Sequence, residues 1–113
     1  MRGRIADPQR ILHILDAIAE IESYIEEIDS FKFSSQSVIK FATIKQLEII
    51  GEAANHLSEE FLTSTSDIPW KEIISLRNVL VHEYFGIDEI LIWQIITVDI
   101  PQLKEKLKNI DLG

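Results

Sequence analysis

The sequence contains no cysteine among its 113 residues. This absence excludes a disulfide scaffold, a thiolate zinc site and a cysteine nucleophile. It also lacks the apolar run of a signal peptide near its first residues. No apolar stretch approaches the roughly 20 residues that a helix needs to cross a bilayer. We therefore expect a cytoplasmic protein with no membrane-bound part.

Basic residues are outnumbered, with 11 Lys and Arg against 19 Asp and Glu, which gives a formal net charge of −8. Generic, charge-driven binding of nucleic acid needs Lys and Arg against the phosphates, so this charge argues against it. Any contact with RNA must be local, or shared with a partner or a second subunit. The charge is otherwise explained by solubility, or by a basic protein partner.

The length fits one compact domain over residues 1–113. Hydrophobic residues make up 46% and charged residues 27%, which is typical of a globular protein and not of a disordered chain. A domain of this size buries only about two thirds of its unfolded surface. Association with a second copy would therefore add useful burial.

No segment alternates with the period of two expected of a strand, whereas helical spacing recurs throughout. Asp7-Pro8 has the features of a helix start, and the first helix should end near residues 29–30. Further helices are expected from about residue 35 to Leu57, from Trp70 to about His82, and from Asp88 onward. Pro101 should kink or break the last one near Val98. We predict an all-α fold, an antiparallel bundle of four to five helices.

Gly51 lies inside the second expected helix, where glycine weakens a helix by roughly 1 kcal/mol relative to alanine. We interpret this glycine as a point where another helix approaches closely.

The most unusual stretch places Arg77, Asn78, His82 and Tyr84 within eight positions of an apolar run. Polar groups in such surroundings need partners or a function. Asn78 and His82 share one helical face because they are four apart. Arg77 and His82 are rotated by about 140° beyond a full turn, so they would not converge in one regular helix. They could line one cleft if the helix distorts, or if two copies face each other.

A purely structural interpretation competes with a catalytic one. Arg77 could pair with Glu48 or Glu52, which lie four apart on one face of the second helix. His82 could cap the third helix and interact favourably with its dipole. His13 and His56 have no evident companions, and no spacing of histidines predicts a metal site. We expect no metal and no cofactor.

Three runs together identify a family resemblance. They are Leu47-Glu-Ile-Ile-Gly-Glu-Ala-Ala-Asn, Ile68-Pro-Trp-Lys-Glu-Ile and Leu76-Arg-Asn-Val-Leu-Val-His-Glu-Tyr-Phe-Gly. In this order they closely resemble the HepT-like branch of the HEPN superfamily, and the resemblance covers nearly the whole chain. It implies a HEPN-like helical bundle that forms a homodimer, with the Arg and His motifs of two subunits meeting in one cleft.

The resemblance also implies a metal-independent ribonuclease that acts as the toxin of a toxin–antitoxin system. Arg77 would bind the scissile phosphate of an RNA substrate, His82 would act as general acid or base, and Asn78 would orient His82 or the phosphate. Glu48 and Glu52 are candidates for supporting roles. The implied partner is an MntA-type nucleotidyltransferase antitoxin that transfers AMP to the tyrosine two places after the histidine, here Tyr84. Bulk and negative charge at that position would oppose binding of an RNA phosphate.

Two other functions are compatible with the same residues. The chain could be a non-catalytic binding subunit of a two-component nucleotidyltransferase, or a non-catalytic dimerisation domain. The presence of both Arg77 and His82 favours a ribonuclease, whereas the acidic charge favours the other two.

Overall fold

The computed structural model describes residues 2–82, 86 and 88–110, and the described residues form helices and turns without a strand. The helices are α1 (Arg2–Ile25), α2 (Ser30–Ser35), α3 (Ser37–Asn55), α4 (Glu59–Ser64), α5 (Trp70–His82), α6 (Glu89–Gln94) and α7 (Ile100–Lys108), with a π-helical segment η2 (Ile95–Asp99) joining the last two. The all-α prediction is confirmed. None of these helices is long and apolar enough to cross a membrane.

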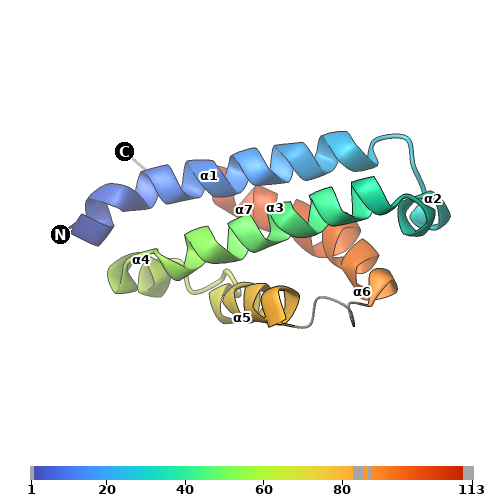
Figure 1. The fold of residues 1–113 in the computed structure, drawn as a ribbon. Helices are drawn as coiled ribbons and strands as arrows, with labels where there is room; N and C mark the ends of the chain where they lie inside the picture. The colour runs from blue at the N-terminus through green and yellow to red at the C-terminus, as the bar shows by residue number, and fades with distance from the viewer. Residues whose placement is uncertain (1, 83–85, 87, 111–113) are drawn as a thin grey trace.

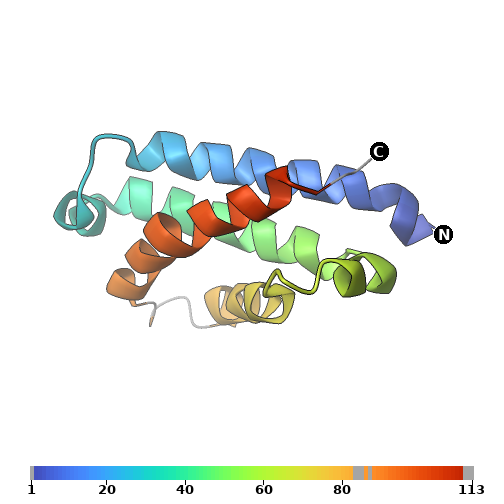
Figure 2. The same ribbon diagram turned by 180° about the vertical axis from the view of Figure 1, so that it is seen from behind.

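The long helices run back and forth along one axis of the molecule. Helices α1 and α3 lie side by side, and α5 packs against the opposite side of α3 (Figure 1). The short helices α2 and α4 lie at opposite ends of α3, where the chain reverses. Seen from behind, the segment from α6 to α7 returns across the molecule and α7 contacts α1 (Figure 2).

The core lies between α1, α3 and α7, and branched aliphatic side chains dominate it. Helix α1 contributes Ile11, Ile14, Ile18 and Ile21, each no more than 1% exposed. Their spacing of three and four residues places them on one face, which buries against α3. The other buried hydrophobic residues include Phe33, Ile44, Leu47, Ile50, Leu80, Ile92, Ile96, Leu103 and Leu107.

The predicted start of the first helix is wrong. Helix α1 begins at Arg2 and contains Pro8 inside it. Asp7 does not cap α1. Its carboxylate accepts hydrogen bonds from the backbone N–H of Ser58 (2.9 Å) and from the Ser58 hydroxyl (2.6 Å). Asp7 is 3% exposed, and Ser58 is the N-cap of α4. A residue interpreted as a local cap is therefore a long-range link between two helices.

The first helix ends before the predicted residues 29–30, and a short helix that the sequence did not predict follows it, so the described residues form more helices than the four to five expected. Helix α1 ends at Ile25, and Glu27 adopts a left-handed backbone conformation with φ of 69°. Asp29 then caps α2 by accepting a hydrogen bond from the backbone N–H of Lys32 at 2.8 Å. Helix α2 buries Phe33 completely, and the ring of Phe33 lies 5.4 Å from that of Trp93.

The interruption expected near Val98 is confirmed. The helix changes to π geometry over Ile95–Asp99 and returns to α geometry at Ile100, one residue before Pro101. Proline has no backbone N–H and its ring clashes with the carbonyl four residues earlier, so the helix must widen or bend there. Asp88 caps α6, as the sequence predicted.

Candidate active site

Helix α5 contains the predicted catalytic residues. Its first residue, Trp70, is held by a side-chain hydrogen bond. The indole N–H of Trp70 donates a hydrogen bond to the hydroxyl of Thr65 at 2.9 Å. The Trp70 ring is 5% exposed and lies 6.3 Å from the ring of Phe61. This bond joins the start of α5 to the end of α4, which sets the direction in which α5 leaves the loop.

Helix α5 crosses α3 with Arg77 directly against Gly51. A Cβ atom added to Gly51 would collide with the Cβ of Arg77 and would lie 3.2 Å from the backbone oxygen of Ile73. Any larger residue at position 51 would force the two helices apart. The prediction that this glycine allows close approach of another helix is confirmed, and the approaching residue is the candidate catalytic arginine.

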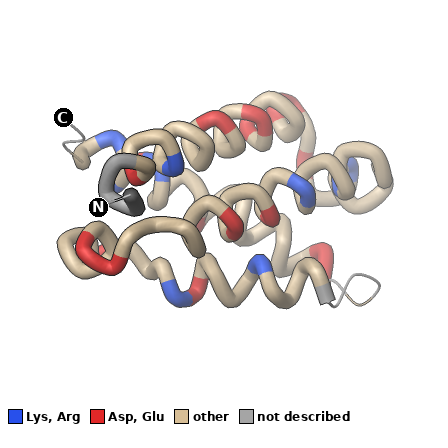
Figure 3. The backbone as a smooth tube through the Cα atoms, turned by 60° about the vertical axis from the view of Figure 1, so that its left-hand side comes forward, with Lys and Arg blue, Asp and Glu red and all other residues tan. Residues whose placement is uncertain are grey.

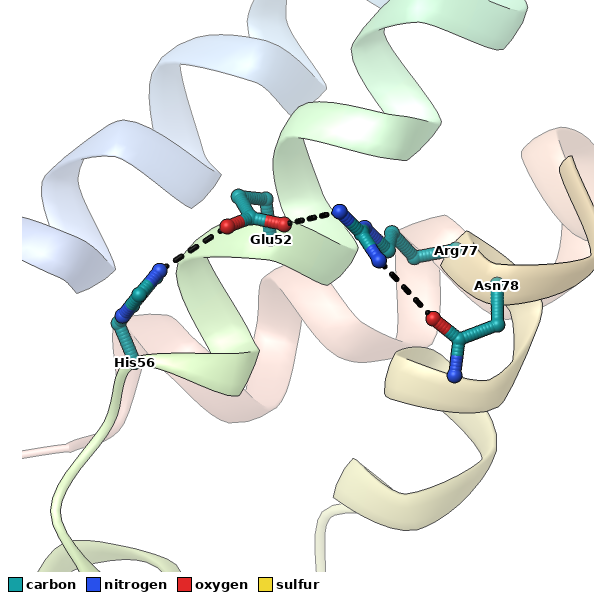
Figure 4. A network of polar contacts seen from close by, with 4 residues as sticks. All are labelled: Glu52, His56, Arg77 and Asn78. Atoms are coloured by element: carbon teal, nitrogen blue, oxygen red, sulfur yellow. Dashed lines mark hydrogen bonds and ion pairs between the residues drawn. The ribbon is translucent and has the colours of Figure 1, made fainter. Parts of the chain in front are cut away.

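Four polar residues form one network across this crossing (Figure 4). The Nη2 atom of Arg77 lies 2.8 Å from Oε2 of Glu52, an ion pair between α5 and α3. The Nη1 atom of Arg77 donates a hydrogen bond to Oδ1 of Asn78 at 3.0 Å. The other oxygen of Glu52, Oε1, lies 2.9 Å from Nε2 of His56. A single carboxylate therefore bridges an arginine and a histidine.

The network leaves the guanidinium accessible. The Arg77 side chain is 32% exposed, and Asn78 lies at the surface. A guanidinium carries five N–H donors in a planar fork that matches the oxygens of a phosphate. Glu52 and Asn78 engage only part of this set. The arrangement can therefore fix the position of Arg77 and still offer donors to an anionic ligand.

The hydrogen bond from His56 lowers the pKa of Glu52 below its ordinary value of 4.5, and the positive charge of Arg77 acts in the same direction. Partial desolvation opposes both effects. Glu52 is therefore ionised at neutral pH, which is the state that an ion pair with Arg77 requires.

The sequence proposed Glu48 and Glu52 equally as partners of Arg77, and the structure distinguishes them. Glu52 makes the ion pair, whereas Glu48 is half-buried one turn earlier and takes no part in the described network. His82 is the last residue of α5, and its side chain lies outside the described part of the chain. Tyr84 also lies outside the described residues. The proximity of Arg77 to His82 is thus still a prediction.

The sequence interpretation of His56 as a histidine without a companion is wrong. His56 pairs with Glu52, four residues before it on the same helical face. The spacing of Glu52 and His56 was a usable signal. A Glu and a His four residues apart on one helix predict a side-chain contact of this kind, whether or not a metal is bound. Within the described parts of the chain, no group of three or more His, Asp or Glu side chains is placed to hold a metal ion.

A groove of about 680 Å³ lies on the other side of α5, between that helix and the α6–α7 segment. Its floor is apolar and includes Leu47, Ile73 and Leu76. Val79 and Leu91, at 50% and 49% exposure, contribute to its wall and are open to solvent. Arg77 and Glu52 do not line it, so the polar network and the groove occupy different faces of α5.

The acidic character of the chain is visible over its surface. Acidic residues follow one another along the end of α1, while Lys and Arg are scattered and form no continuous band in this view (Figure 3). A long nucleic acid requires an extended series of basic residues, and the described Lys and Arg positions along the tube are not arranged in one in this view. Any interaction with a phosphate would rely on a few local donors such as Arg77.

A family model described as "Ribonuclease HepT-like" matches residues 14–110. The matched segment contains the whole of α3 and α5, including Gly51, Glu52, Arg77 and His82. Seven curated proteins are significantly similar to the chain, and no solved structure is.

Three of these relatives illustrate the similarity. The protein of Methanocaldococcus jannaschii named "Putative RNase MJ1380" is 39% identical over 84% of this chain and 87% of its own length. "Putative RNase TTE0752" of Caldanaerobacter subterraneus is 41% identical over 87% of this chain and 88% of its own length. "Probable ribonuclease HepT" of Thermococcus cleftensis is 38% identical over 86% of this chain and 88% of its own length.

Proposed function

The chain belongs to the HepT-like ribonuclease family, and from this premise we propose that it is the toxin of a toxin–antitoxin system, cleaving RNA without a metal through Arg77 and His82. The observation that carries the proposal is the accessible guanidinium of Arg77, held by Glu52 and Asn78 above the crossing of α3 and α5. A fixed arginine that keeps free donors suits a phosphate whose negative charge grows during reaction.

The proposed reaction uses the 2′-hydroxyl of the RNA as nucleophile. A general base removes the proton of that hydroxyl, and its oxygen attacks the adjacent phosphorus. The bond from phosphorus to the 5′-oxygen breaks, and a general acid protonates the departing oxygen. The products are a 2′,3′-cyclic phosphate and a 5′-hydroxyl. His82 acts as the acid or base because an imidazole exchanges protons near neutral pH, and Arg77 stabilises the charge on the phosphate oxygens.

A homodimer would complete the site. His82 ends α5, and its angular offset from Arg77 within a regular helix is too large for both to face one phosphate. Two copies that place their α5 ends together would bring an arginine from one subunit near a histidine from the other. The exposed apolar residues around the end of α5 and on α6 support this arrangement. They are Val79, Val81, Ile90 and Leu91. Val79 and Leu91 both line the apolar groove beside α5, and an exposed apolar surface of this kind suits an interface.

Cleavage is tested with purified protein on total RNA and on a mixed-sequence RNA oligonucleotide, in EDTA. We expect products whose 3′ ends become extendable by a poly(A) polymerase only after the cyclic phosphate is removed. Arg77→Ala and His82→Ala should abolish cleavage and the growth arrest caused by expression, while Lys45→Ala, an exposed change on α3, should do neither. Wild-type protein that leaves both RNAs intact would exclude the ribonuclease, and undiminished cleavage by His82→Ala would exclude the catalytic role of His82.

We further propose that a nucleotidyltransferase antitoxin neutralises the protein by transferring AMP to Tyr84. The hydroxyl oxygen of Tyr84 would attack the α-phosphorus of ATP, with release of pyrophosphate and of the phenolic proton. The position two residues after His82 supports this, because a nucleotide there would occupy the space of the RNA phosphate. Co-expression with the antitoxin should raise the intact mass by one or more AMP groups, and Tyr84→Phe should prevent the change and escape neutralisation. An unchanged mass of the wild-type chain would refute this step.

A second candidate function, a binding subunit without catalysis, is favoured by the net charge of −8. In that case the chain would bind a separately encoded nucleotidyltransferase and would be harmless when expressed alone. The RNA cleavage assay separates the two functions, because only the ribonuclease loses an activity in His82→Ala.

A further inference from the structure

We propose that Glu52 is a positioning residue for Arg77, and that His56 holds the far oxygen of the same carboxylate in place. This inference deepens the proposed ribonuclease function and rests on it. It assigns roles to Glu52 of α3 and to His56, the C-cap of that helix, which both lie outside the motif of Arg77, His82 and Tyr84.

The geometry shows why the carboxylate is suited to this role. Its two oxygens are engaged on opposite sides, Oε2 by Arg77 at 2.8 Å and Oε1 by His56 at 2.9 Å. A carboxylate held at both oxygens cannot rotate without losing one partner. His56 directly follows the last residue of α3, and Arg77 belongs to α5. The carboxylate of Glu52 is therefore held by side chains from two separate parts of the backbone.

The contact between Glu52 and Arg77 also leaves Arg77 able to bind an anionic ligand. Oε2 of Glu52 is shielded from solvent and lies 2.8 Å from Nη2 of Arg77. This ion pair localises the guanidinium through one of its nitrogens and leaves other N–H donors available. A flexible arginine side chain loses rotamer entropy when it is fixed on a ligand, and holding it beforehand spares the transition state that cost.

The negative charge of Glu52 predicts different effects of its removal on kcat and on KM. A negative group beside a phosphate site repels the substrate, so its removal should not weaken binding. Loss of orientation should instead slow the chemical step, since a misplacement of about 1 Å can cost about a hundredfold in rate. We therefore expect Glu52→Gln to lower kcat by about tenfold to a hundredfold with KM unchanged or decreased.

Glu22 provides a matched control. It forms an ion pair with Lys104 at 3.0 Å, between α1 and α7, and its side chain is 45% exposed, as is that of Glu52. Glu22→Gln removes a carboxylate of the same exposure from another interhelical pair, far in the sequence from the network. It should leave both kcat and KM at their wild-type values.

A double-mutant cycle with Arg77→Lys, which keeps the positive charge and measurable cleavage but not the planar fork, tests whether Glu52 acts through Arg77. If it does, Glu52→Gln should cost less cleavage in the Arg77→Lys protein than in the wild type. An independent effect of the two changes would show that Glu52 has a general structural role and would overturn the proposal. His56→Ala should produce a smaller loss than Glu52→Gln, and His56→Gln, which keeps a side-chain donor, should restore part of it.

The restriction of the Arg77 guanidinium can be measured by NMR in the absence of RNA. In wild-type protein and in Glu22→Gln, we expect separate NMR signals for the two Nη groups of Arg77, because a held guanidinium rotates slowly. In Glu52→Gln these signals should merge. Merged signals in the wild type would refute the positioning role even if RNA is cleaved. Separate signals in a protein that cleaves no RNA would instead confirm the positioning and refute the ribonuclease. Circular dichroism confirms that each variant is folded.

Discussion

Gly51 of α3 lies against the Cβ of Arg77 on α5, so closely that no other residue fits between the two helices at this point. The same contact places the guanidinium of Arg77 beside Glu52, the next residue of α3. Packing and polar contacts are therefore coupled, since the glycine sets the distance that the ion pair needs.

Gly51→Ala tests this coupling. Alanine favours a helix by about 1 kcal/mol over glycine, yet the added methyl group must displace α5. Overpacking of this kind costs about 1–3 kcal/mol, so we expect a net loss of stability in spite of the better helix former. Urea unfolding measures it, and cleavage should fall with it. Lys45→Ala, at an exposed site of α3, should stabilise slightly or not at all. A Gly51→Ala protein more stable than the wild type would show that the helices separate without cost.

Asp7→Ala should destabilise the protein although Asp7 takes no part in the network of Glu52, His56, Arg77 and Asn78. The change removes both hydrogen bonds to Ser58 and leaves its backbone N–H without this acceptor, which costs about 1–3 kcal/mol. Chemical denaturation measures the loss, and Asp16→Ala at an exposed position of α1 is the control. Equal stability of the two variants would mean that the buried link between α1 and α4 contributes nothing.

Acidification should weaken the fold partly through Glu52. Its pKa in the folded protein is below the ordinary value of 4.5, chiefly because of His56, so the unfolded chain binds a proton more readily than the folded one. The resulting stabilisation is present above pH 4.5 and disappears as the pH falls through the lowered pKa. Urea unfolding of wild type and Glu52→Gln at a series of pH values checks this. The two stabilities should converge on acidification, and a constant difference across the series would contradict the assignment.

The hydrogen bond between Trp70 and Thr65 should contribute to stability, because both groups are buried. Trp70→Phe removes the donor and leaves a cavity, whereas Thr65→Val leaves the indole N–H unpaired and removes the hydroxyl's bond to the Phe61 carbonyl, so each should cost about 1–3 kcal/mol. The double variant should be more stable than the sum of the two losses predicts. Thermal unfolding of the four proteins measures the difference, and strict additivity would show that the two groups do not interact.

The helical spacing of apolar residues was sufficient to predict the long helices. The ranges expected for the second and third helices agree with Ser37–Asn55 and Trp70–His82 within about two residues, as is usual for helix ends. The predictions that were wrong concern both ends of the first helix and the partners of single polar residues. Asp7 has the sequence features of a cap but bonds to a residue 51 positions away. No local pattern distinguishes these two uses of the same carboxylate.

The sequence by itself determined the all-α class, the positions of the long helices, the glycine at a helix crossing and the family of the chain. These depend on periodicity, on proline and glycine, and on motifs, all of which are local along the chain. The tertiary structure alone decided which glutamate pairs with Arg77, that His56 shares that glutamate, and which face of α5 is left as an apolar groove. Glu48 and Glu52 share one face of α3, and only the angle and height at which α5 crosses that helix select between them.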